Sequence, residues 1–600
     1  MISPMRKYTF VVYSNDYAGF LRALQDIGVV HIVEKKSAQD DDGVRQLGAN
    51  AARISRALQI LGRRKTEAGV TPANKDSAEA VLSELDICLQ EKEKLDQALV
   101  ILNKEIGILQ PWGDMPVTAI EALAREQVHA KFYVVSNKKF SEQWSAAHAI
   151  AVVHNDGTNT YFVRFIQEGG AAEPELLGAE EVRLPQRVLS AALAEREKSV
   201  QANAELQTRI SALAMGNAPD MLRAELAHIL SEADFTRATL SADAGVEDQV
   251  RILQGWVPAE REAQVAAAAD AKSVVTLAED PAEEDDVPIQ LKNGTFSRLF
   301  EPISKMFALP TYMELDLTAF FAPFFTLFFG LCLGDGGYGL VIMVACLAAR
   351  FKVKKDVKPL CTLGFIFGFA TLVVGCVTSN FFGVTLYESF PSLKQYILFT
   401  DTKDLFNLAL GIGLVQIIFG MCIQVANRWR QSGFLAALPT IGWIIIIFSL
   451  LGMAGAELVG EGVANIAQYT ALVGVVLILF FNDLRANIFL RIGKGVWELY
   501  NITGIFGDLL SYVRLFALGL SGGVLGIVVN QLGGQLLGIP VIGIVLYALF
   551  LLVGHTGVLL LSALGAFVHP MRLTFVEFYK NAGFTGGGKA YKPLAAKKIK

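Results

Sequence analysis

The apolar residues of this 600-residue chain are distributed so unevenly that they divide it into two halves. From Met1 to about Thr318 charged residues are frequent, and no apolar run approaches the roughly 20 residues that a helix needs to cross a bilayer. From Ala319 to Tyr579 long apolar runs dominate. The overall hydrophobic content of 52% is therefore the mean of a water-soluble half and a membrane half. The formal net charge of −5 argues against a nucleic-acid partner.

The membrane half contains seven apolar segments, at about 319–350, 359–383, 404–426, 434–456, 466–481, 503–534 and 539–579. The first segment is longer than one span but shorter than two, and GDGGYG interrupts its middle. If it is a tight hairpin with its turn outside, the cytoplasmic linkers carry 16 Lys and Arg, whereas the outside linkers carry only Lys394 and Lys403. Because basic residues gather on the cytoplasmic side, we predict eight spans, cytoplasmic termini and a basic tail at 580–600.

Two long helical patterns mark the soluble half, 1–318. Leucine and isoleucine recur mostly at three- and four-residue steps from Ser77 to Gln110, and a second pattern runs from about Pro185 to Phe235. We expect helical arms at about 44–110 and 185–235 that pair as a long antiparallel coiled coil. A pair of ordinary core helices in a larger domain is the alternative.

Short β-rich patches flank these arms and predict small α+β lobes at the arm ends. The patches are Tyr8–Tyr13 with Gly28–Val33, Ala130–Ser136 with Ala149–His154 and Tyr161–Ile166, and Val250–Val257 with Ser273–Leu277. An acidic linker at about 279–288, expected to be a solvated hinge, leads toward the membrane half. The expected fold class is an α-helical polytopic membrane domain plus cytoplasmic α/β lobes joined by a coiled coil.

Neither export nor metal binding is indicated. The apolar stretch near the amino end is too short and too soon interrupted to be a secretory signal, so residues 1–318 should stay in the cytoplasm. The six cysteines form no CxxC pair, and five lie in apolar surroundings. We interpret them as small core residues, and we expect no metal and no cofactor.

Two arginines lie in apolar spans. Arg514 follows GIFGDLLSYV, and Arg572 follows LLLSALGAFVHPM. An arginine inside a span costs roughly 2.5–3.5 kcal/mol on insertion scales, so it persists where it has a partner or a water-filled cavity. Function is the default interpretation of both. The alternative is an arginine near a helix end whose side chain reaches the membrane surface.

Other polar residues share these two helices. Asp508 and Ser511 precede Arg514, and the small residues from Ser521 to Gly523 leave one face open to another helix. On the last span the polar residues His555, Ser562, His569, Arg572 and Glu577 recur over about six turns, with the first four near one face. They predict a polar track, although each could instead be a separately satisfied helix-packing group.

At this point a resemblance becomes specific. GDLLSYVRLFALGL and SALGAFVHPMRLTFVEFYKNAGFTGGGKAYKP resemble the signature of the last two membrane helices of V/A-type ATPase subunit a, called subunit I in prokaryotes. FGLCLGDGGYG, with Gly334, Asp335 and Gly336, resembles the first hairpin of that family. With the arms and spans, the similarity covers essentially the whole chain.

The cytoplasmic part carries a further matching motif. LQGWVP, with Gly255, Trp256 and Pro258, resembles the family's closing cytoplasmic lobe. Well-known eukaryotic relatives place a histidine and a glutamate where this chain has Gly522 and Ser562. The resemblance therefore implies that the entry half-channel is lined differently here.

The resemblance implies a stator subunit of a rotary ATPase or ATP synthase, with two tilted helices that separate two half-channels for H⁺ or Na⁺. Arg514 matches the essential arginine opposite the carboxylate of a proteolipid c-ring, and Arg572 matches the second arginine. Further implied partners are peripheral-stalk E/G-type subunits, a central-stalk d/C-type subunit and the lipid bilayer. The expected location is a prokaryotic plasma membrane, and ATP chemistry would belong to other subunits.

The sequence GFTGGGK (Gly583–Lys589) comes close to a phosphate-binding loop. However, Ala590 replaces the Ser or Thr that would bind Mg²⁺, and an apolar helix precedes the motif instead of a strand. We therefore do not expect ATP to bind here.

Two other classes of protein remain open at the level of sequence. A secondary ion transporter would often contain an internal repeat of broken helices, and we see no matching halves. A membrane-anchored signalling protein would explain the arms but not the two arginines. For the ion, H⁺ is favoured over Na⁺, because His555, His569 and Glu577 could relay protons.

Overall fold

The computed structural model describes residues 1–600 except for 36–39, 64–69, 116, 141–143, 145–148, 168–177, 186, 246, 283, 356, 386–401, 456–460, 483–486 and 597–600. Lys394 of the expected outside linker and the end of the expected basic tail lie outside the described residues. The chain divides into two compact units. The first unit contains Met1–Phe20, Val29–Val33 and Asp243–Pro593, and the second contains Leu21–Gly28, Glu34–Ala242 and Leu594–Lys600.

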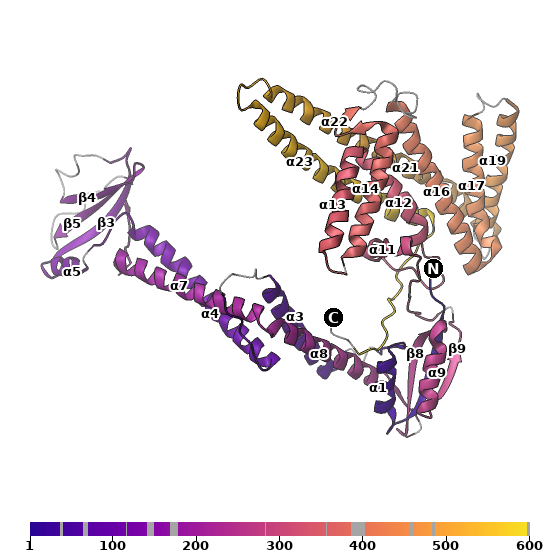
Figure 1. The fold of residues 1–600 in the computed structure, drawn as a ribbon, viewed down its shortest axis with the longest axis horizontal. Coiled ribbons are helices and arrows are strands. Elements are labelled where there is room, and N and C mark those ends of the chain that lie inside the picture. The colour runs from indigo at the N-terminus through magenta and orange to yellow at the C-terminus, as the bar shows by residue number, and fades with distance from the viewer. Residues whose placement is uncertain are drawn as a thin grey trace. The chain divides into compact units, whose positions relative to one another are not determined.

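Four helices make the main body of the second unit: α3 (Asp42–Gly62), α4 (Ala78–Leu109), α7 (Leu189–Met215) and α8 (Ala218–Leu240). α4 lies beside α7 and α3 lies beside α8 (Figure 1). Buried leucine, isoleucine and alanine side chains from all four helices form one core. The helix expected from Ser77 to Gln110 is α4, and the Ser77 hydroxyl caps it by accepting from Ala80 N (3.2 Å).

The structure differs from the expectation of one helix over 185–235. Gly216 ends α7 and α8 begins two residues later. A Cβ at Gly216 would lie 2.0 Å from Ala73 O, so the neighbouring segment can approach only because this residue has no side chain. The stretch 44–110 likewise contains two helices, α3 and α4.

An antiparallel sheet completes the second unit. Its strands are β3 (Val128–Ser136), β4 (Ile150–Asn155), β5 (Asn159–Gln167) and β6 (Glu180–Glu181), in the order β4-β5-β3-β6. Tyr133, Val135 and Phe162 form its buried core. This sheet contains the second of the predicted β-rich patches.

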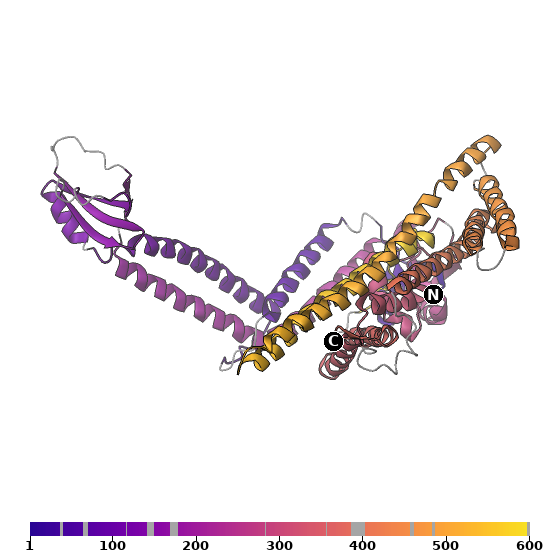
Figure 2. The same cartoon turned by 90° about the horizontal axis from the view of Figure 1, so that it is seen from above.

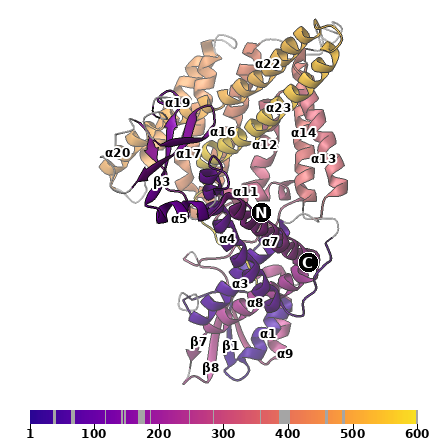
Figure 3. The ribbon, with the colours of Figure 1, turned by 90° about the vertical axis from the view of Figure 1, so that its left-hand side faces the viewer.

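The first and third patches form a single antiparallel sheet in the first unit (Figure 3). Its strands are β1 (Met5–Tyr13), β2 (His31–Ile32), β7 (Asp243–Gly245), β8 (Val250–Pro258) and β9 (Val275–Glu279), in the order β2-β8-β1-β9 with β7 also on β8. The LQGWVP motif is part of β8. A Cβ at Gly255 would lie 2.6 Å from Val30 Cγ1, so the motif glycine allows β2 to approach.

Six helices in the described part of the first unit are long and apolar enough to cross a membrane. They are α14 (Lys358–Thr378), α16 (Thr402–Ser432), α17 (Phe434–Ala454), α19 (Glu461–Phe481), the run of α20 (Ile488–Leu499), α21 (Ile502–Ser511) and α22 (Val513–Leu536), and α23 (Gly543–Arg572) with its continuation. Before them come two shorter helices, α12 (Thr318–Leu333) and α13 (Gly336–Lys352). Segment 319–350 is therefore two helices.

The turn between α12 and α13 depends on a fully buried carboxylate. Gly334 ends α12 in the left-handed region (φ 61°), and Asp335 caps α13. Asp335 Oδ1 accepts from the backbone N of Gly337 (2.9 Å), Tyr338 (3.2 Å) and Phe382 (2.9 Å), and Oδ2 accepts from Gly383 N (2.9 Å). One side chain thus fixes both the hairpin and the turn that follows α14.

The last helix changes its pitch near its end. α23 continues as the π-helix η3 (Leu573–Phe578) and then as α24 (Tyr579–Asn581). A π-helical turn carries an extra residue, so it rotates the residues beyond it relative to those before it. α22 and α23 lie side by side and run obliquely past α13 and α14 (Figures 1 and 2).

The segment after α24 pairs with the linker that follows β9 in the sequence. Ile289 N donates to Lys589 O (2.7 Å), and Tyr591 N donates to Ile289 O (3.1 Å). A Cβ at Gly588 would lie 2.0 Å from Pro310 O. GFTGGGK is therefore an irregular segment with left-handed backbone at Gly583, Gly586 and Gly587, and it follows a helix as the sequence indicated.

This tail also packs against the five-stranded sheet of the first unit. Tyr591 packs with Met5, Trp256 and Val287, and its hydroxyl donates to Val29 O. Two of the sequence motifs, LQGWVP and GFTGGGKAYKP, therefore meet in one small hydrophobic cluster.

Candidate functional site

Arg514 is the second residue of α22 and lies at a partly buried position. Its Nη1 is buried and has no hydrogen-bond partner within the part of the chain that the structure describes. The residues on either side in the helix are tightly held: Leu515 is buried, and the fully buried Tyr512 donates to Gln416 Oε1 (2.8 Å). Among the described residues, no salt bridge neutralises this guanidinium.

Glu577 lies on the π-helical turn and is buried, with Oε2 lacking a hydrogen-bond partner among the described residues. Its carboxyl lies beside the Ser511 hydroxyl and within electrostatic reach of Arg514 and Arg572. In a regular helix a residue five positions beyond Arg572 would point away from it; the π turn reduces that rotation. The turn therefore brings the carboxylate toward the arginine-bearing face of α22.

Asp508 pairs with two residues of the C-terminal part of the chain, Lys580 and Asn581. Its carboxylate accepts from Lys580 Nζ (3.0 Å) and from Asn581 Nδ2 (3.0 Å), and Asn581 also donates to Glu577 O (2.7 Å). Lys580 is half exposed, whereas the Asp508 side chain is largely covered. Hydrogen bonds thus link the half-exposed Lys580, through Asp508 and Asn581, to the backbone carbonyl of Glu577.

Gln416 is a site residue that the sequence analysis did not single out. It is fully buried on α16, where its Oε1 accepts from Tyr512 and its Nε2 has no partner among the described residues. A Cβ at Gly413, one turn earlier, would touch the Tyr512 ring, and one at Gly420 would contact Asn581. Gln416 therefore lies on the stripe of α16 that faces this cluster.

Four buried polar atoms without partners among the described residues belong to α16 and to α22 and η3, both of which contact α16. They are Arg514 Nη1, Gln416 Nε2, Thr574 Oγ1 and Glu577 Oε2. Buried polar groups in proteins are nearly always satisfied, by protein or by ordered water. Donors and acceptors left over together therefore mark this cluster as one that needs further partners, from protein or from water. A lone amide inside an apolar run was the signal in the sequence that could have found Gln416.

Arg572 and His569 lie on the other side of the same region. Arg572 is exposed and His569 is partly exposed, and both arginines lie within electrostatic reach of His569. Arg572 thus differs from Arg514 in having its guanidinium at an open surface of α23.

The two positions that depart from the family pattern face each other. A Cβ built on Gly522 would lie 3.5 Å from Ser562 Oγ and 3.5 Å from Leu333 O. Nearby, a Cβ at Gly519 would lie 2.5 Å from Leu331 O. The small-residue run of α22 is therefore used for close contact with α12 and α23.

His555 belongs to a separate polar cluster farther along α23. Its Nδ1 lies 2.7 Å from Tyr338 Oη, and its Nε2 lies 3.0 Å from Asn530 Oδ1. Asn530 Nδ2 donates to Phe382 O (2.7 Å), which fixes the amide orientation and makes its Oδ1 the acceptor for His555. A neutral imidazole with its proton on Nε2 satisfies every bond, with Tyr338 donating to Nδ1.

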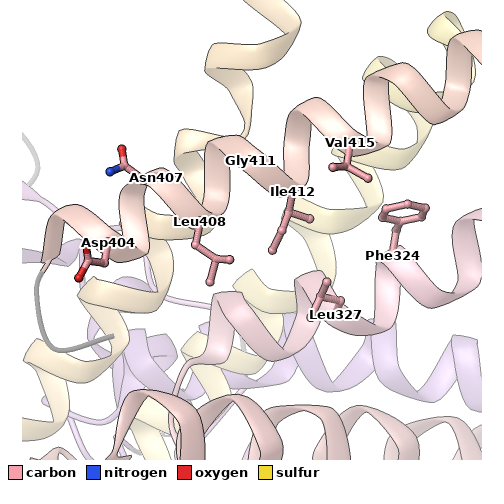
Figure 4. A pocket seen from close by; sticks show the side chains of 8 residues that line it. All are labelled: Phe324, Leu327, Asp404, Asn407, Leu408, Gly411, Ile412 and Val415. Carbon is pink, nitrogen blue, oxygen red and sulfur yellow. The ribbon is translucent and has the colours of Figure 1, made fainter. Parts of the chain in front are cut away.

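A groove of about 800 Å³ runs between α12 and α16 (Figure 4). Leu327, Leu408 and Ile412 point into it, and Asp404 and Asn407 lie at one end. The remaining lining residues are Phe324, Gly411 and Val415. The groove includes none of the predicted site residues.

The predicted residues therefore fall into three places. Asp508, Ser511, Arg514 and Glu577 come together with Gln416, while Arg572 and His569 lie nearby. Ser562 faces Gly522 at the helix contact. His555 lies in the separate cluster. No group of three or more metal-ligating side chains occurs among the residues that the structure describes.

Comparison with known proteins gives full-length relatives. The chain is 26% identical over 99% of its length to the whole V-type ATP synthase subunit I 1 of Treponema pallidum, and 24% identical over all of its length to the whole V-type ATP synthase subunit I of Borreliella burgdorferi. It is 29% identical over 61% of its length to A-type ATP synthase subunit I of Methanocaldococcus jannaschii, of which it covers 58%. No family model matches the chain.

A solved structure of the cytoplasmic N-terminal domain of subunit I, homolog of subunit a, of V-ATPase also matches 46% of this chain and all of that chain. At 14% identity and a TM-score of 0.20, this match carries no argument about the fold. The full-length sequence relatives align across both the soluble and the membrane parts, and they confirm the resemblance seen in the motifs. The chain, a multi-pass membrane protein, is thus similar over its whole length to V-type ATP synthase subunit I and over 61% of its length to A-type ATP synthase subunit I.

Proposed function

We propose that this chain is the stator subunit of a rotary V/A-type ATPase or ATP synthase and forms two half-channels together with a proteolipid ring. The observation that carries the proposal is the buried, unpartnered Nη1 of Arg514 on an apolar helix. A charge in that setting is costly unless another charge or water faces it. A carboxylate on a passing ring supplies the required sign.

Arg514 acts electrostatically in this mechanism. A ring carboxylate crosses lipid in its neutral, ion-loaded form, because a bare charge there is expensive. When the carboxylate faces the guanidinium, its ionised form is favoured and its ion is released into one half-channel. The same fixed charge prevents a direct leak between the two half-channels. Lysine would be a poorer substitute, because it can lose its proton when buried.

The inner half-channel is proposed at the cluster of Asp508, Ser511, Gln416 and Glu577. Its support is the set of buried donors and acceptors without partners, together with the hydrogen bonds that link Lys580 to the backbone carbonyl of Glu577. The outer half-channel is proposed on the side of His555, with Tyr338 and Asn530. The close contact of Gly522 with Ser562 lies between them along α22 and α23.

The transported ion is inferred to be H⁺. His555, His569 and Glu577 are titratable groups through which protons can hop, whereas Na⁺ needs several oxygen ligands or a wide hydrated path. ATP hydrolysis or synthesis takes place on other subunits in this proposal. The chain itself supplies the static wall of the ion path.

For the topology, we propose eight spans at 319–579 in the plasma membrane of a prokaryotic cell. Residues 1–318 and the tail 580–600 then lie in the cytoplasm. The pairing of α4 with α7 and of α3 with α8 supports an antiparallel coiled coil. The lobes at the arm ends are proposed to bind peripheral-stalk E/G-type subunits, and a central-stalk d/C-type subunit is a further proposed partner.

The proposal is tested by replacing Arg514 in the assembled complex. Arg514→Ala should abolish ATP-driven ion uptake into vesicles while a proteolipid ring still copurifies, because a neutral residue can neither ionise the ring carboxylate nor bar the leak. Arg430→Ala is the matched control, since Arg430 is an exposed arginine in the last turn of α16. Full uptake by assembled Arg514→Ala vesicles would refute the proposal, as would solute transport by the chain alone.

A further inference from the structure

α20 connects the last residues of α19 with the arginine-bearing helix, and most of its apolar side chains are exposed. Phe489 is 91% exposed, Trp497 is 77% exposed and Tyr500, which directly follows the helix, is 68% exposed. α20 packs against α19, where a Cβ at Gly495 would lie 2.7 Å from Leu479 Cα. One side of the helix is therefore held by protein, and the aromatic residues are on another.

Helical spacing separates α20 into three faces. At about 100° per residue, Gly495, Ile492 and Leu499 share the face toward α19. Phe489, Val496, Trp497 and Tyr500 share a second face, and Arg491, Lys494 and Glu498 share a third that is opposite the aromatic one. A helix with an aromatic face opposite a charged face is typical of a helix that lies in the plane of a membrane surface.

Length gives an independent argument for this position. The run from Ile488 to Leu536 contains 49 residues, which at about 1.5 Å each far exceeds the roughly 30 Å hydrocarbon thickness. The part from α21 to α22 is already long enough to cross obliquely. α20 is thus the part of the run that is not needed to cross the bilayer, and it precedes the crossing part in the sequence.

We propose that α20 lies in the cytoplasmic surface layer of the bilayer, with Phe489, Trp497 and Tyr500 among the lipid acyl chains just below the headgroups. Arg491 and Lys494 then place positive charge at the level of the phosphates. Trp and Tyr favour this level because they combine an apolar ring with a polar group. The inference rests on the proposed topology, which puts the 482–499 linker on the cytoplasmic side.

Lipid is the occupant that the surroundings favour over a protein. The exposed apolar residues Tyr469, Leu472, Val476 and Phe480 follow one face of α19 toward α20, so the aromatic face continues a lipid-facing surface.

An anchored α20 would also set the depth of Arg514. Short joints connect α20 to α21 and α21 to α22, and the C-terminal residue of each helix still bonds to the preceding turn. A shift of α20 is therefore passed to α22 instead of being absorbed by a flexible loop. Phe489 and Trp497 act here as positioning residues for the ion path.

The experiment measures where Trp497 lies in the assembled complex. Tryptophan fluorescence of wild type and Trp497→Phe is compared in vesicles of phospholipids brominated on the upper acyl chain, and again with aqueous iodide. We expect the difference signal of Trp497 to be quenched by brominated lipid and shielded from iodide. Trp443→Phe, which removes a buried tryptophan of α17, should change neither signal.

A second variant tests the positioning role. Phe489→Ser with Trp497→Ser should lower ATP-driven uptake several-fold in complexes that remain assembled, whereas Leu472→Ser, at an exposed apolar residue of α19, should lower it less. Quenching of Trp497 by iodide, or protection from both quenchers as in a protein interface, would overturn the proposal. The quenching measurement does not depend on ion transport, so the two proposals can fail separately. If Arg514→Ala vesicles transport ions fully while brominated lipid still quenches Trp497, the proposed function is refuted and the position of α20 is not.

Discussion

Removal of the buried Asp335 carboxylate at the first hairpin gives a prediction whose size follows from the four hydrogen bonds that it accepts. Asp335→Ala deletes the cap of α13, which costs about 1 kcal/mol. It also leaves Gly383 N buried without an acceptor, a loss of about 2 kcal/mol, and weakens the more exposed Phe382 N by about 1 kcal/mol. The total loss of stability is about 4 kcal/mol, which is large for one residue.

The prediction extends from stability to transport. The turn held by Asp335 lies directly against α22, where a Cβ at Gly526 would be 2.9 Å from Gly383 Cα, and Phe382 O accepts from Asn530. Release of the turn therefore disturbs the polar cluster around His555. We expect Asp335→Ala to lower ATP-driven ion uptake as well as the unfolding temperature of the detergent-solubilised complex.

Two comparisons make the result interpretable. Asp335→Asn keeps one carbonyl oxygen for the N–H groups on the Oδ1 side but turns an amide toward Gly383 N, so it should lose about half as much stability. Asp404→Ala, at an exposed carboxylate near the start of α16, should leave the unfolding temperature unchanged. If Asp335→Ala and Asp404→Ala unfold at the same temperature, the four bonds do not stabilise the hairpin and the reasoning is wrong.

Three further outcomes are expected. Arg572→Ala should reduce ion uptake less completely than Arg514→Ala, because Arg572 is exposed; equal losses would show that this ranking is wrong. Hydrogen bonds from Lys7 and from a backbone N–H hold the pKa of Asp285 below its usual value, so the ionised carboxylate stabilises the fold fully above about pH 4 and loses this effect as the pH falls through the lowered pKa. Asp285→Asn should therefore make the free energy of unfolding less dependent on pH in the acid range, and an unchanged pH dependence would contradict this. Gly588→Ala should destabilise tail docking by about 1–3 kcal/mol through its clash with Pro310 O, measured as faster proteolysis of the tail, whereas Gly107→Ala, where nothing lies within 4 Å, should not.

Local patterns in the sequence predicted those features that depend on neighbouring residues. The leucine spacing predicted α4, and the Ser77 cap fixes its start. GDGGYG inside an overlong apolar segment predicted a hairpin, which the structure has at Gly334 and Asp335. The cost of charge in lipid singled out Arg514, which is partly buried with an unpartnered nitrogen. Each of these inferences needed only one stretch of chain.

Features that depend on contacts between distant segments could not be predicted in the same way. Nothing in the sequence near Gln416 says that Tyr512 will bind it, because the two lie in different helices. The π-helical turn that moves Glu577 is a change of pitch for which a side-chain pattern gives no sign. The broken arm has the same origin, since Gly216 acquires its meaning only from the backbone of Ala73.

The glycines of three motifs that carry the resemblance serve close backbone contact. In GDGGYG a Cβ at Gly336 would lie 2.6 Å from the Phe381 ring, in LQGWVP one at Gly255 would lie 2.6 Å from Val30, and in GFTGGGK one at Gly588 would lie 2.0 Å from Pro310 O. None of these glycines contributes a group that could carry an ion. Glycine is needed at such points because any side chain would push two segments apart. These glycines therefore specify how the first hairpin, β8 and the tail pack against their neighbours. The chemistry of the proposed ion path depends instead on a few polar residues of α16, α22 and α23, which the glycine motifs do not predict.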